Sequence, residues 1–270
     1  MSRLLCLGFG YSARALAATL DGWQITGTSR DGQGGTVRFD RNRVLPPYFF
    51  AGVTHLLVSI PPDDDGDPAF DRHRDDIAAL THLQWLGYLS TTGVYGNRDG
   101  GWVNEGSDLR PTGPRGERRC DAEEKWQSLG AHVFRLAGIY GPGRSAFDRL
   151  RAGTARRFDR RGQMFSRIHV DDLVTVLRAS MARPRPGAVY NVCDNEPAAP
   201  ADVIAYAAAL LGVAPPPLEP FDPASLSPMA RSFWADNKRV SNALIKRELG
   251  VVLRHPDYRA GLAAILAAAG

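Results

Sequence analysis

A glycine-rich turn joins an apolar run to a helix-forming stretch within the first 20 residues. Residues 4–7 are apolar, and the spacing G-x-G-x-x-A follows at once as Gly8, Gly10 and Ala13. An alanine-rich stretch to Leu20 is typical of a helix, and residues 23–30 are typical of a second strand. Such glycines permit a tight turn and let a pyrophosphate approach the backbone where the helix begins. The pattern predicts a βαβ unit that binds a dinucleotide. The contacting residues expected are Gly8, Phe9, Gly10, Tyr11 and Ser12.

The end of the second strand predicts which dinucleotide is preferred. NAD is held by a carboxylate about 20 residues after the glycines, which binds the ribose 2′-hydroxyl. Here that place holds Thr28, Ser29 and Arg30, and the first acid is Asp31. A guanidinium and two hydroxyls suit a 2′-phosphate better, so we predict NADP(H) rather than NAD, with Ser29 and Arg30 at the phosphate. The alternative is a plain strand–helix turn in which Arg30 is a solvated surface charge.

The chain of 270 residues is long enough for one large α/β domain, or for a domain with a smaller lobe. Its net charge of +4 is spread along the sequence, and the richest basic stretch covers residues 149–161. That stretch has no interleaved aromatic residue beyond Phe158, so we predict a solvated face or a site for an anionic substrate rather than nucleic-acid binding.

Cysteines, histidines and apolar runs exclude several classes of protein. Cys6, Cys120 and Cys193 show no C-x-x-C spacing, which predicts free thiols in a reducing cytoplasm. No apolar run approaches the 18 or so residues of a membrane span, and residues 4–7 are too short for a signal peptide. The six histidines show no H-E-x-x-H or paired spacing, so we predict no metal site.

Strand and helix patterns alternate along the chain. Strands are expected at residues 4–7, 23–30, 36–39, 55–60, 85–90, 132–136 and 188–193, helices at 14–20, 68–83, 122–129, 171–181, 200–211 and 257–268, and a proline-rich loop at 215–228. The strands are continuously apolar rather than alternating, which indicates a parallel sheet covered on both faces. Ligands bind outside the carboxyl ends of such strands. Residues 8–13, Arg30, 59–62 and 90–96 are therefore expected around one crevice.

Several further segments carry a family resemblance. They are residues 89–96 (LSTTGVYG), 135–144 (RLAGIYGPGR), 167–173 (RIHVDDL), 190–192 (YNV) and the 238–250 region. Together and in this order they resemble the extended short-chain dehydrogenase/reductase superfamily, of the NAD(P)-dependent epimerase/dehydratase type. The resemblance implies a Rossmann-type doubly wound parallel sheet with a small C-terminal substrate lobe. It places the core at about residues 1–144 plus 166–194 and the lobe at about 145–165 plus 195–270, and by analogy allows a homodimer.

The resemblance also implies roles for residues at the strand ends. Family members use a Ser/Thr after the fifth strand, which corresponds to Thr91, and a residue after the third strand near the adenine, which corresponds to Asp40. The end of the fourth strand adds a further expected contact with the cofactor. Its residues are Ser59, Ile60 and Pro61.

The sequence departs from the family at the Tyr-x-x-x-Lys pair, which moves the proton and binds the nicotinamide ribose. Arg115 and Arg119 stand at those positions, and no tyrosine occurs between Tyr95 and Tyr140. A guanidinium stays charged and cannot donate a proton near neutral pH, although Arg119 is suited to ribose hydroxyls or a phosphate. The chain is therefore expected to be an atypical member.

Three outcomes follow from this departure. Tyr95 or Tyr140 replaces the proton donor, or Thr91 acts with an acid carried by the substrate, or the protein binds NADP(H) without turnover as a redox sensor. Against the first stands the packing role common for buried tyrosines. Against the second, Thr91 and its neighbours cap the strand end. A serine hydrolase is not favoured, because the chain has no G-x-S-x-G elbow.

Four residues are candidates for binding substrate. Arg135 and Arg144 bracket a loop at the expected crevice, where they bind an anionic group, unless Arg135 pairs internally with an acid. His169 is more often structural at its place in the motif, and the following pair Asp171 and Asp172 is expected to cap a helix. The substrate-binding candidates are Arg135, Tyr140, Arg144 and His169.

Overall fold

The computed structural model describes residues 2–269. The strands are β1 (Arg3–Leu7), β2 (Gln24–Ser29), β3 (Val37–Arg38), β4 (His55–Val58), β5 (Trp85–Thr91), β6 (Trp102–Val103), β7 (His132–Leu136), β8 (Gly138–Tyr140), β9 (Arg157–Asp159), β10 (Arg167–His169), β11 (Val189–Val192), β12 (Leu218–Pro220) and β13 (Arg239–Val240). The helices are α1 (Tyr11–Ala17), α2 (Pro68–Ala78), α3 (Pro114–Ser128), α4 (Ala146–Arg151), α5 (Val170–Ala182), α6 (Pro200–Leu210), α7 (Pro228–Ala235), α8 (Ala243–Leu249) and α9 (Tyr258–Ala267). Short 3₁₀ turns are η1 (Pro47–Phe49), η2 (Thr92–Tyr95) and η3 (Pro223–Ser225).

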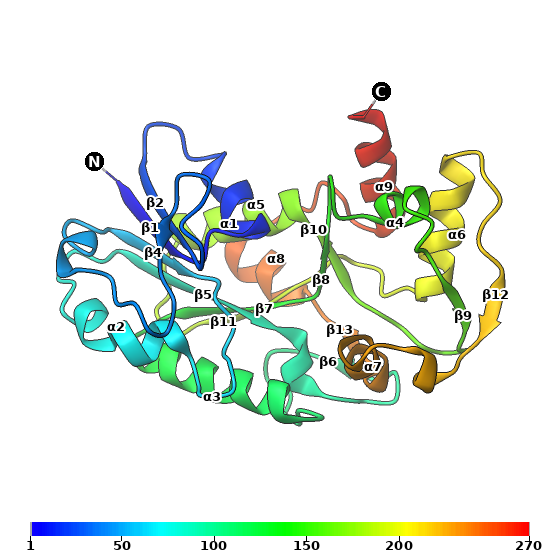
Figure 1. The fold of residues 1–270 in the computed structure, drawn as a ribbon, viewed down its shortest axis with the longest axis horizontal. Coiled ribbons are helices and arrows are strands. Elements are labelled where there is room, and N and C mark those ends of the chain that lie inside the picture. Colours follow the sequence, from blue (N-terminus) through cyan, green and yellow to red (C-terminus); the bar gives the residue numbers. More distant parts are fainter. Residues whose placement is uncertain (1, 270) are drawn as a thin grey trace. The chain divides into compact units, whose positions relative to one another are not determined.

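A seven-stranded sheet in the order β11-β7-β5-β4-β1-β2-β3 forms the centre of the fold (Figure 1). β1 pairs in parallel with both β2 and β4, and β4 pairs in parallel with β5. The chain moves outward from β1 in one direction through β2 and β3, and then returns to the other side of β1 through β4 and β5. This order confirms the predicted Rossmann-type sheet and makes the β1–β4 junction a topological switch point.

Helices cover both faces of this sheet, as the continuously apolar strands predicted (Figure 1). Residues three apart in a strand point to opposite faces. On β5, Trp85 Nε1 accordingly donates to Ser180 Oγ of α5, whereas Tyr88 stacks on Trp126 of α3 at a centroid distance of 5.9 Å. All four residues of β4 are buried, as expected for a strand that is covered on both faces of the sheet.

The chain divides into two compact units. Unit 1 comprises residues 1–94, 113–135 and 174–190, and unit 2 comprises residues 95–112, 136–173 and 191–270. The units are of nearly equal length, so unit 2 is larger than the small lobe expected from the sequence. The difference arises because segments around the Val-Tyr-Gly and Tyr-Gly-Pro-Gly motifs cluster with the C-terminal residues rather than with the sheet.

Unit 2 is built from short parallel strand pairs and helices. β8 pairs with β10, β9 with β12, and β6 with β13. Its core gathers Phe147 of α4, Ala207 of α6 and Leu262 of α9 around Tyr140 and Tyr258. None of β6, β8, β9, β10, β12 and β13 was expected from the sequence, because strands of two or three residues are too short to show a periodicity.

Helix boundaries differ from the expected ones in two instructive places. α3 begins at Pro114, eight residues before the expected start, because a proline at the first helical position and Glu117 in the first turn favour a helix there. That part of α3 is largely solvated and shows no apolar stripe. α2 ends at Ala78 rather than residue 83, and Leu80 and Leu83 reach the core from the turn that follows.

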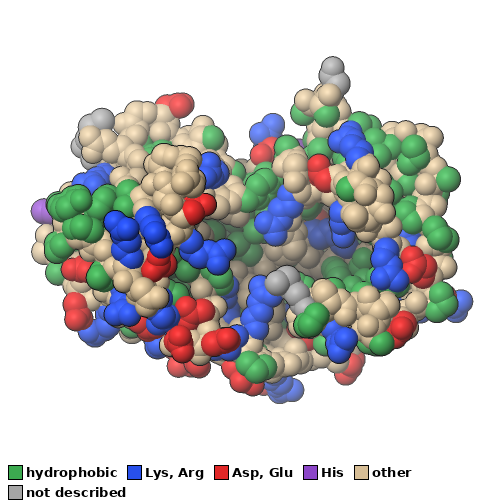
Figure 2. All heavy atoms as spheres, in the orientation of Figure 1, with side chains coloured by type: hydrophobic (Ala, Val, Ile, Leu, Met, Phe, Trp, Pro, Cys, Tyr) green, Lys and Arg blue, Asp and Glu red, His purple; other side chains and the backbone are tan. Residues whose placement is uncertain are grey.

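The remaining structural expectations concern surface and thiols. Cys6 and Cys193 are buried and Cys120 is half-buried, and all three are free. Among residues 2–269, no helix is both long enough and apolar enough to cross a membrane. On the face drawn in Figure 2, basic and acidic side chains are mixed rather than gathered by sign.

Gly27 generates a testable prediction because of how closely β2 approaches the loop after β1. A Cβ at Gly27 would lie 2.3 Å from Cγ of Phe9, whereas a Cβ at Gly10 would meet nothing within 4 Å. Gly27→Ala should therefore lower the free energy of unfolding by about 1–3 kcal/mol through overpacking. Gly10→Ala should change it by less than about 1 kcal/mol. Urea denaturation of both variants measures the difference, and equal effects would contradict the close packing.

Candidate functional site

The glycine-rich turn is fixed between the ends of three neighbouring strands of unit 1. The Gly8 N–H donates to Thr28 Oγ1 at 2.9 Å, and Ser59 Oγ donates to the Gly8 carbonyl at 2.7 Å. The Phe9 N–H donates to the Thr28 carbonyl at 2.7 Å. Gly8 has φ +92°, and a Cβ there would lie 2.7 Å from Ser59 Oγ. Glycine is therefore required at position 8 by both conformation and space.

The second glycine of the turn has a different environment. Gly10 is exposed, and a Cβ at this position would project into open space. It precedes α1, whose first turn, with Tyr11 and Ser12, receives no hydrogen bond from a capping side chain. Arg14 turns back over the loop, where its Nε donates to the Phe9 carbonyl at 2.9 Å and its guanidinium lies 5.3 Å from the Phe9 ring centroid. The loop therefore presents backbone and an arginine to the solvent.

At the end of β2, both hydroxyls that were expected near the phosphate have partners within the chain. Thr28 is fully buried, and its hydroxyl is used by Gly8 N and the Cys6 carbonyl. Ser29 Oγ is shared among Asp31 Oδ1, Thr36 Oγ1 and the Gly32 N–H. Neither hydroxyl is left over for a phosphate.

Exposed charges near the end of β2 include Arg30, Asp31, Arg14 and, on the paired strand β3, Arg38. Hydrogen bonds from the Gln33 N–H and the Ser29 hydroxyl lower the pKa of Asp31. Arg14 extends from the glycine turn toward the 32–35 loop, since a Cβ at Gly34 would lie 3.5 Å from its Nη2. Arg14 was not predicted from the sequence as a residue of this site. An arginine four residues after the second glycine was the available signal.

The other expected cofactor residues of unit 1 also lie at strand ends. Ser59, Ile60 and Pro61 follow β4, and Asp40 follows β3. Asp40 accepts from the Asn42 N–H at 2.9 Å and pairs with Arg38 at 3.4 Å, so it already stabilises its own turn.

Thr91 and Arg119 lie beside the end of β5. Thr91 Oγ1 accepts from the Gly93 N–H at 3.1 Å, which is the strand-end capping that the sequence left open as an alternative. Arg119 Nη1 donates to the Tyr88 hydroxyl at 2.9 Å and to the Leu89 carbonyl at 3.0 Å. Arg115, one turn earlier on α3, is exposed.

A buried ion pair lies behind these residues and settles one alternative. Arg135 of β7 is 5% exposed, and its Nη2 donates to Glu123 Oε2 of α3 at 2.8 Å. Its Nε contacts both carboxylate oxygens, at 3.0 and 3.2 Å, and Ser90 Oγ donates to Oε1. Arg135 is thus engaged internally, because a guanidinium buried at this depth requires an anionic partner. Its predicted role in substrate binding is not supported by this geometry.

The two candidate tyrosines belong to unit 2, and both hydroxyls have partners. Tyr95 is fully buried and donates to Asn191 Oδ1 at 2.7 Å. Tyr140 is 8% exposed and donates to the Asp257 carbonyl at 3.3 Å, and burial raises its pKa. These contacts give both rings a packing role. The predicted catalytic role of Tyr95 stays a prediction that its burial does not favour.

The remaining basic candidates of unit 2 are mostly engaged. Arg144 is exposed in a turn closed by two backbone hydrogen bonds with Gly141. In the basic stretch 149–161, Arg156 pairs with Glu219 at 2.6 Å, and Arg157 Nη1 donates to the Pro216 carbonyl at 3.1 Å. These arginines fasten the stretch to its neighbours rather than forming an open anion site.

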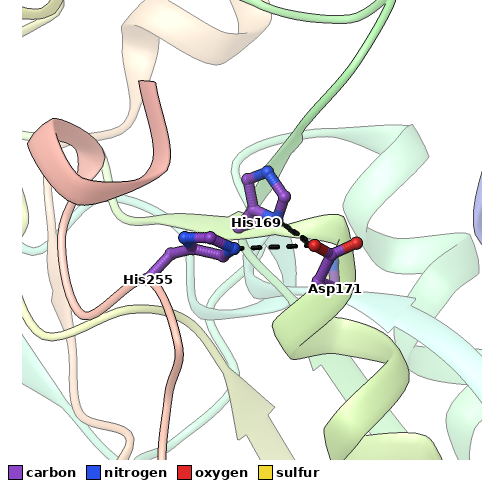
Figure 3. A group of neighbouring side chains, drawn as sticks. All are labelled: His169, Asp171 and His255. Carbon is purple, nitrogen blue, oxygen red and sulfur yellow. Dashed lines mark hydrogen bonds and ion pairs between the residues drawn. The ribbon is translucent and has the colours of Figure 1, made fainter. Parts of the chain in front are cut away.

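His169 lies in a cluster that the sequence did not suggest (Figure 3). Its Nδ1 is 3.6 Å from Asp171 Oδ2, and the same oxygen is 3.5 Å from His255 Nε2. Burial, with His255 close by, lowers the pKa of His169 to about 4, so its ring is neutral at pH 7. Asp172 accepts the backbone N–H groups of Arg254 and His255 at 2.7 and 2.9 Å. The sequence predicted that Asp172 caps its own helix. Its carboxylate instead holds the backbone of a loop that is distant in sequence.

The buried pair generates a stability prediction. Glu123→Gln leaves the Arg135 charge buried without its counterion, so the free energy of unfolding should fall by about 3–5 kcal/mol. The double variant Glu123→Leu/Arg135→Met removes both charges. Its loss in the free energy of unfolding should be smaller than the sum of the losses in Glu123→Leu and Arg135→Met alone. Chemical denaturation in a double-mutant cycle tests this, and strictly additive losses would contradict the coupling.

Comparison with known proteins supplies the family. No protein-family model matches the chain, and no curated protein does. A functionally unknown conserved protein from Silicibacter pomeroyi is 52% identical, with a TM-score of 0.91 and 99% of each chain covered. A protein from Methylobacillus flagellatus assigned as an NAD-dependent epimerase/dehydratase is 26% identical, with a TM-score of 0.73 over 99% of this chain and 98% of that one.

A third solved structure shares the fold at lower identity. The human epimerase family protein SDR39U1, solved with NADPH, is 16% identical, with a TM-score of 0.74 over 98% of this chain and 99% of that one. The motifs, the sheet order and these relatives agree. The chain belongs to one family with the conserved Silicibacter protein, within the short-chain dehydrogenase/reductase superfamily of the NAD-dependent epimerase/dehydratase type.

Proposed function

We propose that this protein binds NADP(H) and acts as an oxidoreductase or epimerase/dehydratase on a hydroxyl- or carbonyl-bearing small molecule. The observation that carries the proposal is the position of the Gly8–Gly10 turn at the β1–β4 switch point of a parallel sheet. Open α/β sheets bind their ligands outside the carboxyl ends of the strands at such a point.

The residues of unit 1 fit a dinucleotide there. Gly10 leaves backbone open to a close approach, and the first turn of α1 lacks a capping side chain. Ser59, Ile60 and Pro61 after β4, and Thr91 and Arg119 at β5, lie at ends of strands on the same edge of the sheet. When bound, the cofactor supplies hydride transfer, and the chain's own groups hold and orient it.

The preference for NADP(H) rests on two arginines rather than on hydroxyls. Arg30 and Arg14 are exposed at the end of β2 and over the glycine turn. Two guanidiniums suit the 2′-phosphate, which accepts paired N–H donors. Asp31 is the opposing group, since a carboxylate there is the feature that would favour NAD. NADPH in the fold relative SDR39U1 is compatible with this proposal.

When a hydride joins the substrate carbon, a proton must join its oxygen, and when a hydride leaves the carbon, that oxygen must lose a proton. Arg115 and Arg119 cannot exchange this proton near neutral pH. Thr91 is the half-buried hydroxyl beside the end of β5, and it either orients a substrate hydroxyl or only caps the strand. The substrate class implied by the family resemblance includes nucleotide sugars, which are the first compounds to test.

One observation favours a second function, a non-catalytic NADP(H)-binding redox sensor or regulator. The Tyr-x-x-x-Lys positions hold arginines, and the tyrosine nearest in sequence, Tyr95, is fully buried with its hydroxyl bonded to Asn191. A protein that keeps the cofactor fold without the proton relay is suited to sensing the redox state.

Cofactor binding can be tested by thermal unfolding with NADPH, NADP, NADH and NAD. A ligand at about 100 times its Kd should stabilise the protein by roughly 2.7 kcal/mol. Gly10→Ala should abolish most of this stabilisation while leaving the unliganded protein nearly as stable as wild type, because its methyl group occupies space open to the ligand. The proposal would be refuted if none of the four dinucleotides shifted the unfolding temperature.

The cofactor preference has its own test. Arg30→Ala and Arg14→Ala should each weaken NADPH binding by about tenfold or more relative to NADH, since a charged hydrogen bond contributes about 1.5–3 kcal/mol. Asp31→Asn is the matched control and should improve NADPH binding or leave it unchanged. The proposed preference would be contradicted if calorimetry showed weaker NADPH binding in Asp31→Asn and unchanged NADPH binding in the two arginine variants.

Turnover distinguishes the two functions. With a panel of carbonyl substrates, including nucleotide sugars, Thr91→Ala should reduce NADPH oxidation at saturating NADPH at least tenfold. Tyr95→Phe should leave the rate unchanged if Tyr95 only packs, and should abolish oxidation if Tyr95 replaces the missing proton donor. No oxidation by wild type across the panel, with NADPH still bound, would favour the sensor.

A further inference from the structure

We propose that His169, Asp171 and His255 form a binding site for a divalent transition-metal cation, with Zn²⁺ as the first candidate. The three side chains converge from separate parts of unit 2 (Figure 3). His169 ends β10, Asp171 lies in the first turn of α5, and His255 lies in the loop before α9. The sequence predicted no metal site, because these residues share no ligand spacing.

The distances fit a metal better than they fit direct hydrogen bonds. Asp171 Oδ2 is 3.6 Å from His169 Nδ1 and 3.5 Å from His255 Nε2. Hydrogen bonds of this type are usually about 2.7–3.2 Å long. Two ligands of a tetrahedral zinc, each about 2.0–2.1 Å from the metal, lie roughly 3.3 Å apart. The distances from Asp171 Oδ2 to the two imidazole nitrogens are therefore close to the distance between two ligands of one zinc ion.

The buried Nε2 of His255 supports a missing partner at the site. His169 and His255 are 97% and 91% buried as side chains, whereas Asp171 is 48% exposed. Nε2 of each histidine is buried without a hydrogen-bond partner among the described residues. A buried polar atom without a partner is costly, and a cation at His255 Nε2 would satisfy it.

The protonation of His169 also suits ligation. The Asp171 backbone N–H donates to His169 Nδ1 at 3.2 Å, so this nitrogen carries the lone pair. Neutral imidazole is the form that binds metal ions. A cation at Nδ1 would compete with one long hydrogen bond.

Neighbouring residues hold the ligands in place. Asp172 fixes the backbone of His255 through its N–H, and the His169 ring lies edge-on to Tyr140 with centroids 5.2 Å apart. Pre-positioned ligands reduce the entropy lost when a metal binds. Two nitrogens and one oxygen leave a fourth coordination position, and the exposure of Asp171 gives water or a small oxygen ligand access to it.

Metal titration of the full chain tests the site. Protein treated with EDTA and transferred to metal-free buffer is titrated with Zn²⁺ by calorimetry, and with Co²⁺ by visible absorption. We expect one Zn²⁺ per chain and the strong Co²⁺ bands of a four-coordinate site. Asp171→Asn removes a half-exposed ligand, and His255→Phe keeps the ring volume without the nitrogens. Each should weaken Zn²⁺ binding at least about tenfold.

Matched controls separate this site from surface binding. His82→Ala and Asp202→Asn remove an exposed histidine and an exposed carboxylate elsewhere, and should change the Kd for Zn²⁺ less than about twofold. Circular dichroism tests whether each variant is folded. If His255→Phe does not fold, the Zn²⁺ affinity of Asp171→Asn alone decides the outcome. The proposal is overturned if wild type shows no saturable binding of one equivalent, or if Asp171→Asn binds Zn²⁺ as wild type does.

Discussion

The backbone of Gly8 is the point on which the proposed cofactor site depends. Its N–H is held by Thr28 at the end of β2, and its carbonyl by Ser59 after β4. The positive φ of Gly8 turns the chain out of β1 immediately, and Gly27 lets the Phe9 ring lie against β2. These contacts leave Gly10 facing solvent at the switch point. A single closely packed turn thus places open backbone at the switch point, where the proposed phosphate-bearing ligand would bind.

Two arginines of α3 stand where the family resemblance predicts the Tyr-x-x-x-Lys pair. They are Arg115 and Arg119, and Arg119 donates to the Tyr88 hydroxyl and the Leu89 carbonyl. One helical turn further, Glu123 neutralises Arg135 inside the unit. Permanent cations favour binding phosphates and ribose oxygens but do not exchange protons near neutral pH.

Unit 2 differs from unit 1 in how its polar groups are used. In unit 1 the polar strand ends leave Arg14 and Arg30 exposed for a ligand. In unit 2, Arg156, Arg157 and Arg160 of the 149–161 stretch contact Glu219 or neighbouring carbonyls, and Tyr95 and Tyr140 donate to internal acceptors. The His169–Asp171–His255 cluster is the exception, because Asp171 Oδ2 lies 3.6 and 3.5 Å from one ring nitrogen of each histidine, farther than a direct hydrogen bond usually spans.

The sequence by itself determined the parallel sheet and the glycine turn, because continuous apolar runs and glycine spacing are local patterns. It also predicted a dinucleotide ligand, Arg30 as a contact and the absence of a tyrosine between Tyr95 and Tyr140, which follow from residue identity. Tertiary structure alone decided that the Thr28 and Ser29 hydroxyls are occupied, that Arg135 is paired with Glu123, and that Arg14 covers the glycine turn. It alone brought His255 to His169, since residues 86 positions apart meet only when separate elements pack, and no local pattern records that contact.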